Sequence, residues 1–133
     1  MTEFDLISYF FETGKHMNFG IFPNVVMVEY GYSYINNEFI LYIKGSNEDN
    51  NFIRNYIEKD KEAHFYKFLA NGEYIIGNGS VKILETKEEK INGLKMIIKQ
   101  QFGTNEGLTF DEKALNDILI VMILVENYDI IKW

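Results

Sequence analysis

Residues 23–46 read PNVVMVEYGYSYINNEFILYIKGS and contain the clearest strand pattern in the chain. Val, Ile, Tyr and Phe dominate two runs within this segment, Val25–Tyr34 and Glu38–Ile43, and these residue types are enriched in β-strands. Asn36 and Asn37 separate the two runs, and asparagine tolerates the positive φ that a tight turn requires. The segment therefore predicts a β-hairpin.

A second hairpin is predicted further along the chain. Asn71-Gly72 lies between strand patterns at His64–Ala70 and Glu73–Ile76, and Asn-Gly between strand formers is the strongest short-range hairpin signal. Gly77-Asn-Gly-Ser80 interrupts the second strand, which then resumes over Val81–Leu84. Glycines inside a strand indicate a bulge or a barrel corner, so we expect the sheet to bend here.

Two further strands are predicted near the ends of the chain. Asn18–Ile21 is a brief early strand, followed by Pro23 where the next strand would begin. Ile118–Glu126 is almost wholly apolar and predicts the last strand, and Tyr128–Trp133 is expected to tail off after it.

Four segments have helical signals. Apolar residues recur at helical spacing in Phe4–Phe11 and in Phe52–Glu58. Thr86-Lys-Glu-Glu89 is a capping box that opens a third helix, with Gly103 as its C-terminal stop. Thr109-Phe-Asp-Glu112 is predicted to be a second capping box, which opens a shorter helix. Hairpins with interposed helices imply a curved antiparallel sheet, in a single domain over residues 1–133.

Composition excludes several classes of function. The chain has 20 acidic and 13 basic residues and a net charge of −7, with Arg54 as its one arginine, so a nucleic-acid partner is not expected. The absence of cysteine excludes disulfides, thiolate metal sites and a cysteine nucleophile. His16 and His64 lack the spacing of metal ligands, so no metal is expected. No secretory signal or long apolar segment is present, so we expect a cytoplasmic protein without a membrane span.

One turn offers groups that could hold a phosphate, whereas no residue is identified as catalytic. Gly45-Ser46 leads into a predicted helix, so backbone N–H groups, a hydroxyl and a helix N-terminus would meet there beside Lys44. Glu48 and Asp49 lie in the same loop and would repel an anion. On the residues alone, an ordinary solvated loop is the default interpretation and a phosphate site is the alternative.

The order of segments resembles the pyridoxamine 5′-phosphate oxidase-like FMN-binding split-barrel family, in its nitroimidazole-resistance (Nim) and general-stress-protein branch. Pro23–Tyr32 is similar to the family's strand Pro-x-Val-Val-Pro-Val-x-Tyr-Gly-Tyr, and Glu38–Ser46 to the next strand and its phosphate turn. Gly77–Lys90 resembles the glycine-containing strand that leads into a capped helix, and Ile120–Glu126 resembles the last strand. The resemblance covers roughly residues 5–130.

This resemblance implies a mainly β (α+β) fold, a six-stranded antiparallel split β-barrel with peripheral helices. It also implies a homodimer that binds FMN in clefts at the subunit interface and acts as an oxidoreductase on a small molecule. Tyr42 is the closest counterpart of a family histidine near the end of the second strand. The implied cofactor contacts are Val25, Val26 and Met27 for the ring, and Lys44, Gly45, Ser46 and Asn51 for the phosphate.

The chain also departs from the family pattern. Relatives carry Gly-x-Lys or Ser-x-Lys in the phosphate loop, whereas Ser46 here precedes Asn47-Glu-Asp-Asn-Asn51, and Met27 replaces a proline. Each lost charge-assisted hydrogen bond weakens phosphate binding by about 1.5–3 kcal/mol. The alternative is therefore a split-barrel dimer that has lost FMN and serves as a binding or structural module. Another planar ligand, such as haem or a different flavin form, is a third possibility. Tyr30, Tyr32 and Trp133 are candidates for the interface.

Overall fold

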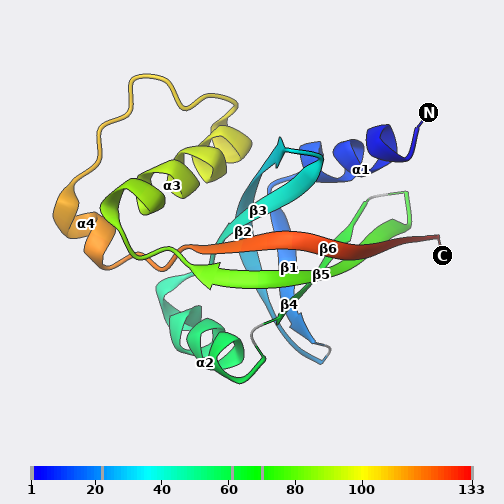
Figure 1. The fold of residues 1–133 in the computed structure, drawn as a ribbon, viewed down its shortest axis with the longest axis horizontal. Coiled ribbons are helices and arrows are strands. Elements are labelled where there is room, and N and C mark those ends of the chain that lie inside the picture. Colours follow the sequence, from blue (N-terminus) through cyan, green and yellow to red (C-terminus); the bar gives the residue numbers. More distant parts are fainter. Residues whose placement is uncertain (1, 22, 61, 70, 133) are drawn as a thin grey trace.

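The computed structural model describes residues 2–21, 23–60, 62–69 and 71–132. Six antiparallel strands form a closed barrel in the order β1-β2-β3-β6-β5-β4, with helices around it (Figure 1). This confirms the predicted fold class. The elements are α1 (Glu3–Glu12), β1 (His16–Ile21), β2 (Asn24–Ile35), β3 (Glu38–Lys44), η1 (Asn47–Asp49), α2 (Asn50–Asp60), β4 (Glu62–Phe68), β5 (Glu73–Ile83), α3 (Lys87–Phe102), α4 (Glu112–Asn116) and β6 (Val121–Lys132).

The first predicted hairpin is confirmed as β2 and β3. Asn36 and Asn37 have φ values of 54° and 64°, as both central residues of a type I′ turn require. This two-residue turn sets the register, which pairs Ile35 with Glu38 and, at the far end, Glu29 with Lys44.

The second hairpin, β4 and β5, is also confirmed, with Gly72 at a φ of 89° in its turn. The bulge expected near the glycines of β5 is present, but β5 continues through them and the extra residue lies in the partner strand. The register shifts between Asn78 and Gly79, which leaves Glu126 of β6 as the unpaired residue. Its carboxylate accepts a 2.9 Å hydrogen bond from the backbone N–H of Ser80.

Two expectations for the C-terminal part were wrong. The strand β6 begins at Val121 and extends to Lys132, so the segment after Glu126 pairs with β5 instead of tailing off. Helix α4 is capped by Asp111, whose side chain accepts from the Lys113 backbone N–H, so the predicted capping box at Thr109 does not form. An aspartate directly before the helix satisfies its first free N–H groups without help from Thr109. Trp133 lies outside the described residues.

The barrel interior is a packed core. Helices α1 and α2 lie at opposite ends of the barrel (Figure 1), and both contribute to its main hydrophobic cluster. Its largest fully buried side chains are Tyr30, Phe10, Phe11, Phe19 and Phe65. The interior is therefore filled by side chains, and a ligand site must lie on the outside of the barrel.

Helix α3 packs against the outer face of β2 and β3. Its ends agree with the prediction: Thr86 and Glu89 form a capping box, and Gly103 stops the helix with a φ of 83°. Ile97, a buried residue of α3, joins a second cluster of buried residues that includes Tyr42 of β3. This helix thus covers the middle of the outer surface of these two strands.

Candidate functional site

The candidate flavin-ring contacts lie on β2, where successive side chains point to opposite faces. Val26 packs against the barrel core, whereas Met27 is 64% exposed on the outer face. Val25 has the same parity as Met27 and is half-buried. The structure therefore brings Val25 and Met27 together on an outer apolar face but turns Val26 away from it.

Tyr42 lies on the same outer face, where α3 covers it. It is 5% exposed and packs with Leu84, Ile97 and Ile120 in the cluster under the helix. A Cβ atom added at Gly93 of α3 would lie 3.2 Å from the Tyr42 ring, so the helix sits directly on it. In this structure the Tyr42 side chain serves to pack α3 against the barrel.

Lys44 ends β3 opposite Glu29 of β2, on the same outer face as Met27. The Lys44 ammonium lies 3.8 Å from the Glu29 carboxylate, and the two side chains are 26% and 40% exposed. The positive charge that would attract a phosphate is thus already beside a carboxylate of the same chain.

The loop after Lys44 is folded on itself. The Ser46 hydroxyl donates a 3.0 Å hydrogen bond to the Asp49 carboxylate, and the Asp49 backbone N–H donates to the Ser46 carbonyl, also at 3.0 Å. A Cβ atom at Gly45 would lie 2.7 Å from Cδ1 of Ile53, so α2 packs tightly under the turn. Asn51 is exposed in the first turn of α2.

The two halves of this region differ in how well they fit FMN. Val25 and Met27 offer an apolar outer strip against which a flat ring could rest. The segment 44–51 contains one cation, Lys44, and the carboxylates of Glu48 and Asp49. The apolar strip therefore fits the ring of FMN. The loop does not fit the phosphate, because Lys44 and Ser46 both face carboxylates.

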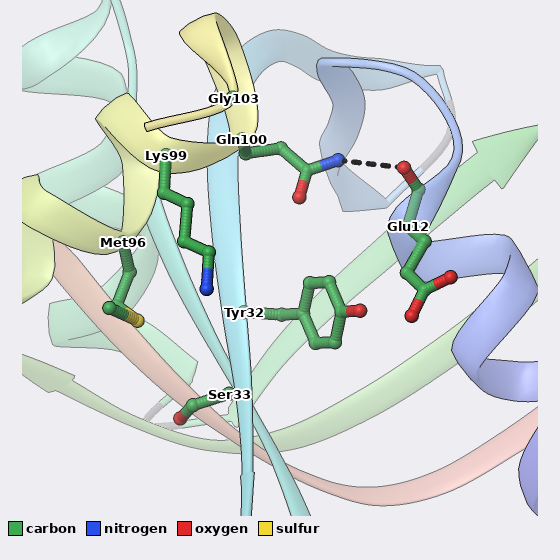
Figure 2. Close-up of a pocket in the computed structure, with 7 residues that line it drawn as sticks. All are labelled: Glu12, Tyr32, Ser33, Met96, Lys99, Gln100 and Gly103. Carbon is green, nitrogen blue, oxygen red and sulfur yellow. Dashed lines mark hydrogen bonds between the residues drawn. The ribbon is translucent and has the colours of Figure 1, made fainter. Parts of the chain in front are cut away.

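A separate hollow of about 560 Å³ lies between the end of α1, β2 and the last turns of α3. Figure 2 shows its lining residues, none of which was identified from the sequence as a site residue: Glu12, Tyr32, Ser33, Met96, Lys99, Gln100 and Gly103. Ser33 is six residues along β2 from Met27, so this hollow is ~20 Å from the apolar strip. Helix α3 lies between them on the outer face.

The Gln100 side chain in this hollow holds α3 to the end of α1. The Gln100 side-chain amide donates to the backbone carbonyls of Glu12 at 3.2 Å and of Gly14 at 2.6 Å (Figure 2 shows the first). Burial, followed by hydrogen bonding to Glu12 and the charge of its carboxylate, raises the pKa of Tyr32 to about 12. Among the described residues, no partner lies within hydrogen-bond distance of the buried Ser33 hydroxyl.

The structure places the candidate interface aromatics in different surroundings. Tyr30 is fully buried inside a single chain, where its hydroxyl donates to the Phe11 carbonyl, so it is not an interface residue. Tyr32 lines the hollow beside α1.

Within the described ranges, no group of three or more His, Asp or Glu side chains could hold a metal ion, and no helix is long and apolar enough to span a membrane.

No family model and no curated protein matches the sequence. Solved structures do match it. A candidate 5-nitroimidazole antibiotic resistance protein from Bacteroides thetaiotaomicron has a TM-score of 0.69 at 16% identity, over 98% of this chain and 84% of that one. A candidate pyridoxamine 5′-phosphate oxidase from Listeria innocua has a TM-score of 0.64 at 15% identity, over 96% of both chains.

A flavocytochrome from Azotobacter vinelandii has a TM-score of 0.70 at 9% identity, over 97% of this chain and 66% of that one. At these identities the likeness concerns the fold. It agrees with the strand order and with the resemblance found in the sequence. The chain therefore has the split-barrel fold of the pyridoxamine 5′-phosphate oxidase-like proteins.

Proposed function

We propose that this chain is a flavin-binding protein, a cytoplasmic homodimer of single-domain subunits that acts as an oxidoreductase on a small molecule. The observation that carries the proposal is the apolar strip formed by half-buried Val25 and exposed Met27 on the outer face of β2. The resemblance implies FMN as the flavin, with its ring on this strip. A bound flavin supplies the electron transfer, and the protein contributes position and electrostatics.

The strip is suited to a flat, largely apolar ring. Met27 of β2 is 64% exposed, and an uncovered methionine gains from burial against a ligand or a partner subunit. Glu29 and Lys44 follow it on the same face and would orient polar atoms of a ligand. The fold of the matched structures, which include a flavocytochrome, also supports a flavin ligand.

The homodimer is supported by the same surface. A ring that rests on an open strand face stays half in water unless a second surface covers it. A second subunit packed over Met27 would provide that cover and exclude water from the ring. Light scattering on the purified protein with added flavin should give the mass of two chains, and the mass of one chain would contradict the dimer.

The first test is flavin binding. We expect purified protein to quench the fluorescence of an added flavin at one flavin per chain. Met27→Asp should weaken this binding by about tenfold or more, because it places a carboxylate under the ring and removes apolar contact. Ile35→Asp is the matched control, since Ile35 is also on β2 and is 52% exposed.

Three outcomes are informative. Weaker binding in Met27→Asp alone supports the proposal. Equal flavin binding by the two variants would show that the ring does not lie on β2. The absence of quenching by any flavin would overturn the proposed function in favour of a split barrel that serves as a binding or structural module.

A further inference from the structure

We propose that the loop at residues 44–51 selects a flavin whose side chain ends without a phosphate, so that riboflavin binds in preference to FMN. This inference rests on the proposed function and specifies the ligand of that same site. It comes from the disagreement between the loop and a phosphate dianion.

The cation of the loop is not available for a phosphate. Lys44 lies 3.8 Å from Glu29, its direct cross-strand neighbour, and neither side chain is more than 40% exposed. A phosphate approaching Lys44 would also approach Glu29. The attraction to the ammonium is therefore largely offset by the repulsion from the carboxylate.

Three hydrogen-bond donors of the loop are also engaged. Ser46 donates its hydroxyl proton to Asp49 at 3.0 Å, which places a carboxylate where a phosphate oxygen would have to sit. The backbone N–H groups of Asp49 and Asn50 donate to the carbonyls of Ser46 and Asn47. A phosphate would have to displace Asp49 and would find these two N–H groups already used.

The charge of the loop favours a neutral hydroxylated ligand. A phosphate monoester carries a charge of about −2 at neutral pH, and Glu48 and Asp49 lie in the same short loop. The ribityl chain of riboflavin ends in an uncharged hydroxyl, which donates a strong hydrogen bond to a carboxylate. The acids that repel FMN therefore become acceptors for riboflavin.

The test compares riboflavin and FMN by fluorescence quenching with the full chain. Riboflavin should bind at least about tenfold more tightly than FMN, which is a difference in binding free energy of about 1.4 kcal/mol. Added salt should strengthen FMN binding, because it screens repulsion, and should leave riboflavin binding unchanged. Asp49→Asn and Glu48→Gln should each reduce the preference, whereas Glu38→Gln, at the far end of β3, should leave it unchanged.

Each result decides a different point. If FMN binds more tightly than riboflavin in the unmodified protein, and salt weakens it, the inference is wrong while the flavin-binding function stands. If Asp49→Asn and Glu48→Gln keep the full preference, the loop is not its source and the inference is also wrong. If neither flavin quenches, the proposed function fails together with the inference.

Discussion

Gly31 of β2 lies so close to Met96 of α3 that a Cβ atom at position 31 would sit 2.2 Å from the Met96 carbonyl oxygen. Only a residue without a side chain lets the helix backbone reach the strand at this point. The contact places α3 over Tyr42 and separates the apolar strip at Met27 from the hollow beside Ser33. One glycine therefore helps to determine which part of the barrel surface remains open to a ligand.

Gly31→Ala should destabilise the protein, because the new methyl group must push α3 away from β2. We expect the free energy of unfolding to fall by about 1–3 kcal/mol or more. Gly107→Ala is the control, since Gly107 has a positive φ of 69° but open space around it, which gives a backbone cost of about 1 kcal/mol. Urea denaturation compares the two variants, and an equal or smaller loss in Gly31→Ala would refute the close contact.

Tyr30→Phe should also be destabilising. Its hydroxyl, inside the barrel, donates its proton to the backbone carbonyl of Phe11 and also lies 3.1 Å from the carbonyl of Thr13, at the end of α1 where no intrahelical donor is left. Loss of a buried hydrogen bond should cost about 1–2 kcal/mol, measured as a lower urea midpoint. Tyr34→Phe removes a hydroxyl that is exposed and should change the midpoint little. Equal effects of the two substitutions would contradict the buried role of Tyr30.

Three of the six strand pairings, β1-β2, β2-β3 and β4-β5, are hairpins that could be predicted from the sequence because turn chemistry is local. The turn at Asn36 and Asn37 also determines the register, so the pairing of Glu29 with Lys44 could have been predicted by counting back from the turn. Strand alternation likewise puts Val26 on the opposite face from Met27. The neutralisation of Lys44 by Glu29, which disfavours a phosphate site, could therefore be predicted from the hairpin sequence.

The covering of Tyr42 and the hollow beside α1 could not be predicted in this way. Both depend on where α3 lies, and that depends on contacts such as Gly31 with Met96, which are far apart in the sequence. The apolar face of a helix indicates that it packs, but not against which strands. The fold was thus more predictable than the surface on which a ligand site depends.

Alkaline pH should unfold the protein partly through Tyr32. Burial and Glu12 raise the pKa of Tyr32 to about 12, so the folded state favours the neutral phenol. This contribution to stability is complete below about pH 10, the ordinary tyrosine pKa, and is lost as the pH rises through 12. The urea midpoint should fall less steeply between pH 10 and 12 in Tyr32→Phe than in the unmodified protein. Lys67, whose pKa burial lowers, is present in both proteins and cancels in the comparison, and identical slopes would show that Tyr32 does not contribute.

Ser33→Ala should stabilise the protein, which is unusual for a change at a half-buried serine. The Ser33 hydroxyl is buried without a partner among the described residues, and an unsatisfied buried hydroxyl costs about 1–3 kcal/mol. Alanine removes this cost, so the free energy of unfolding should rise by about 1 kcal/mol. Ser80→Ala is the matched control, because the Ser80 hydroxyl donates to Glu126 across the bulge, and its loss should be neutral or destabilising. If Ser33→Ala instead lowers the urea midpoint, the hydroxyl has a partner in solution, such as an ordered water in the hollow, and the hollow is then a hydrated polar site.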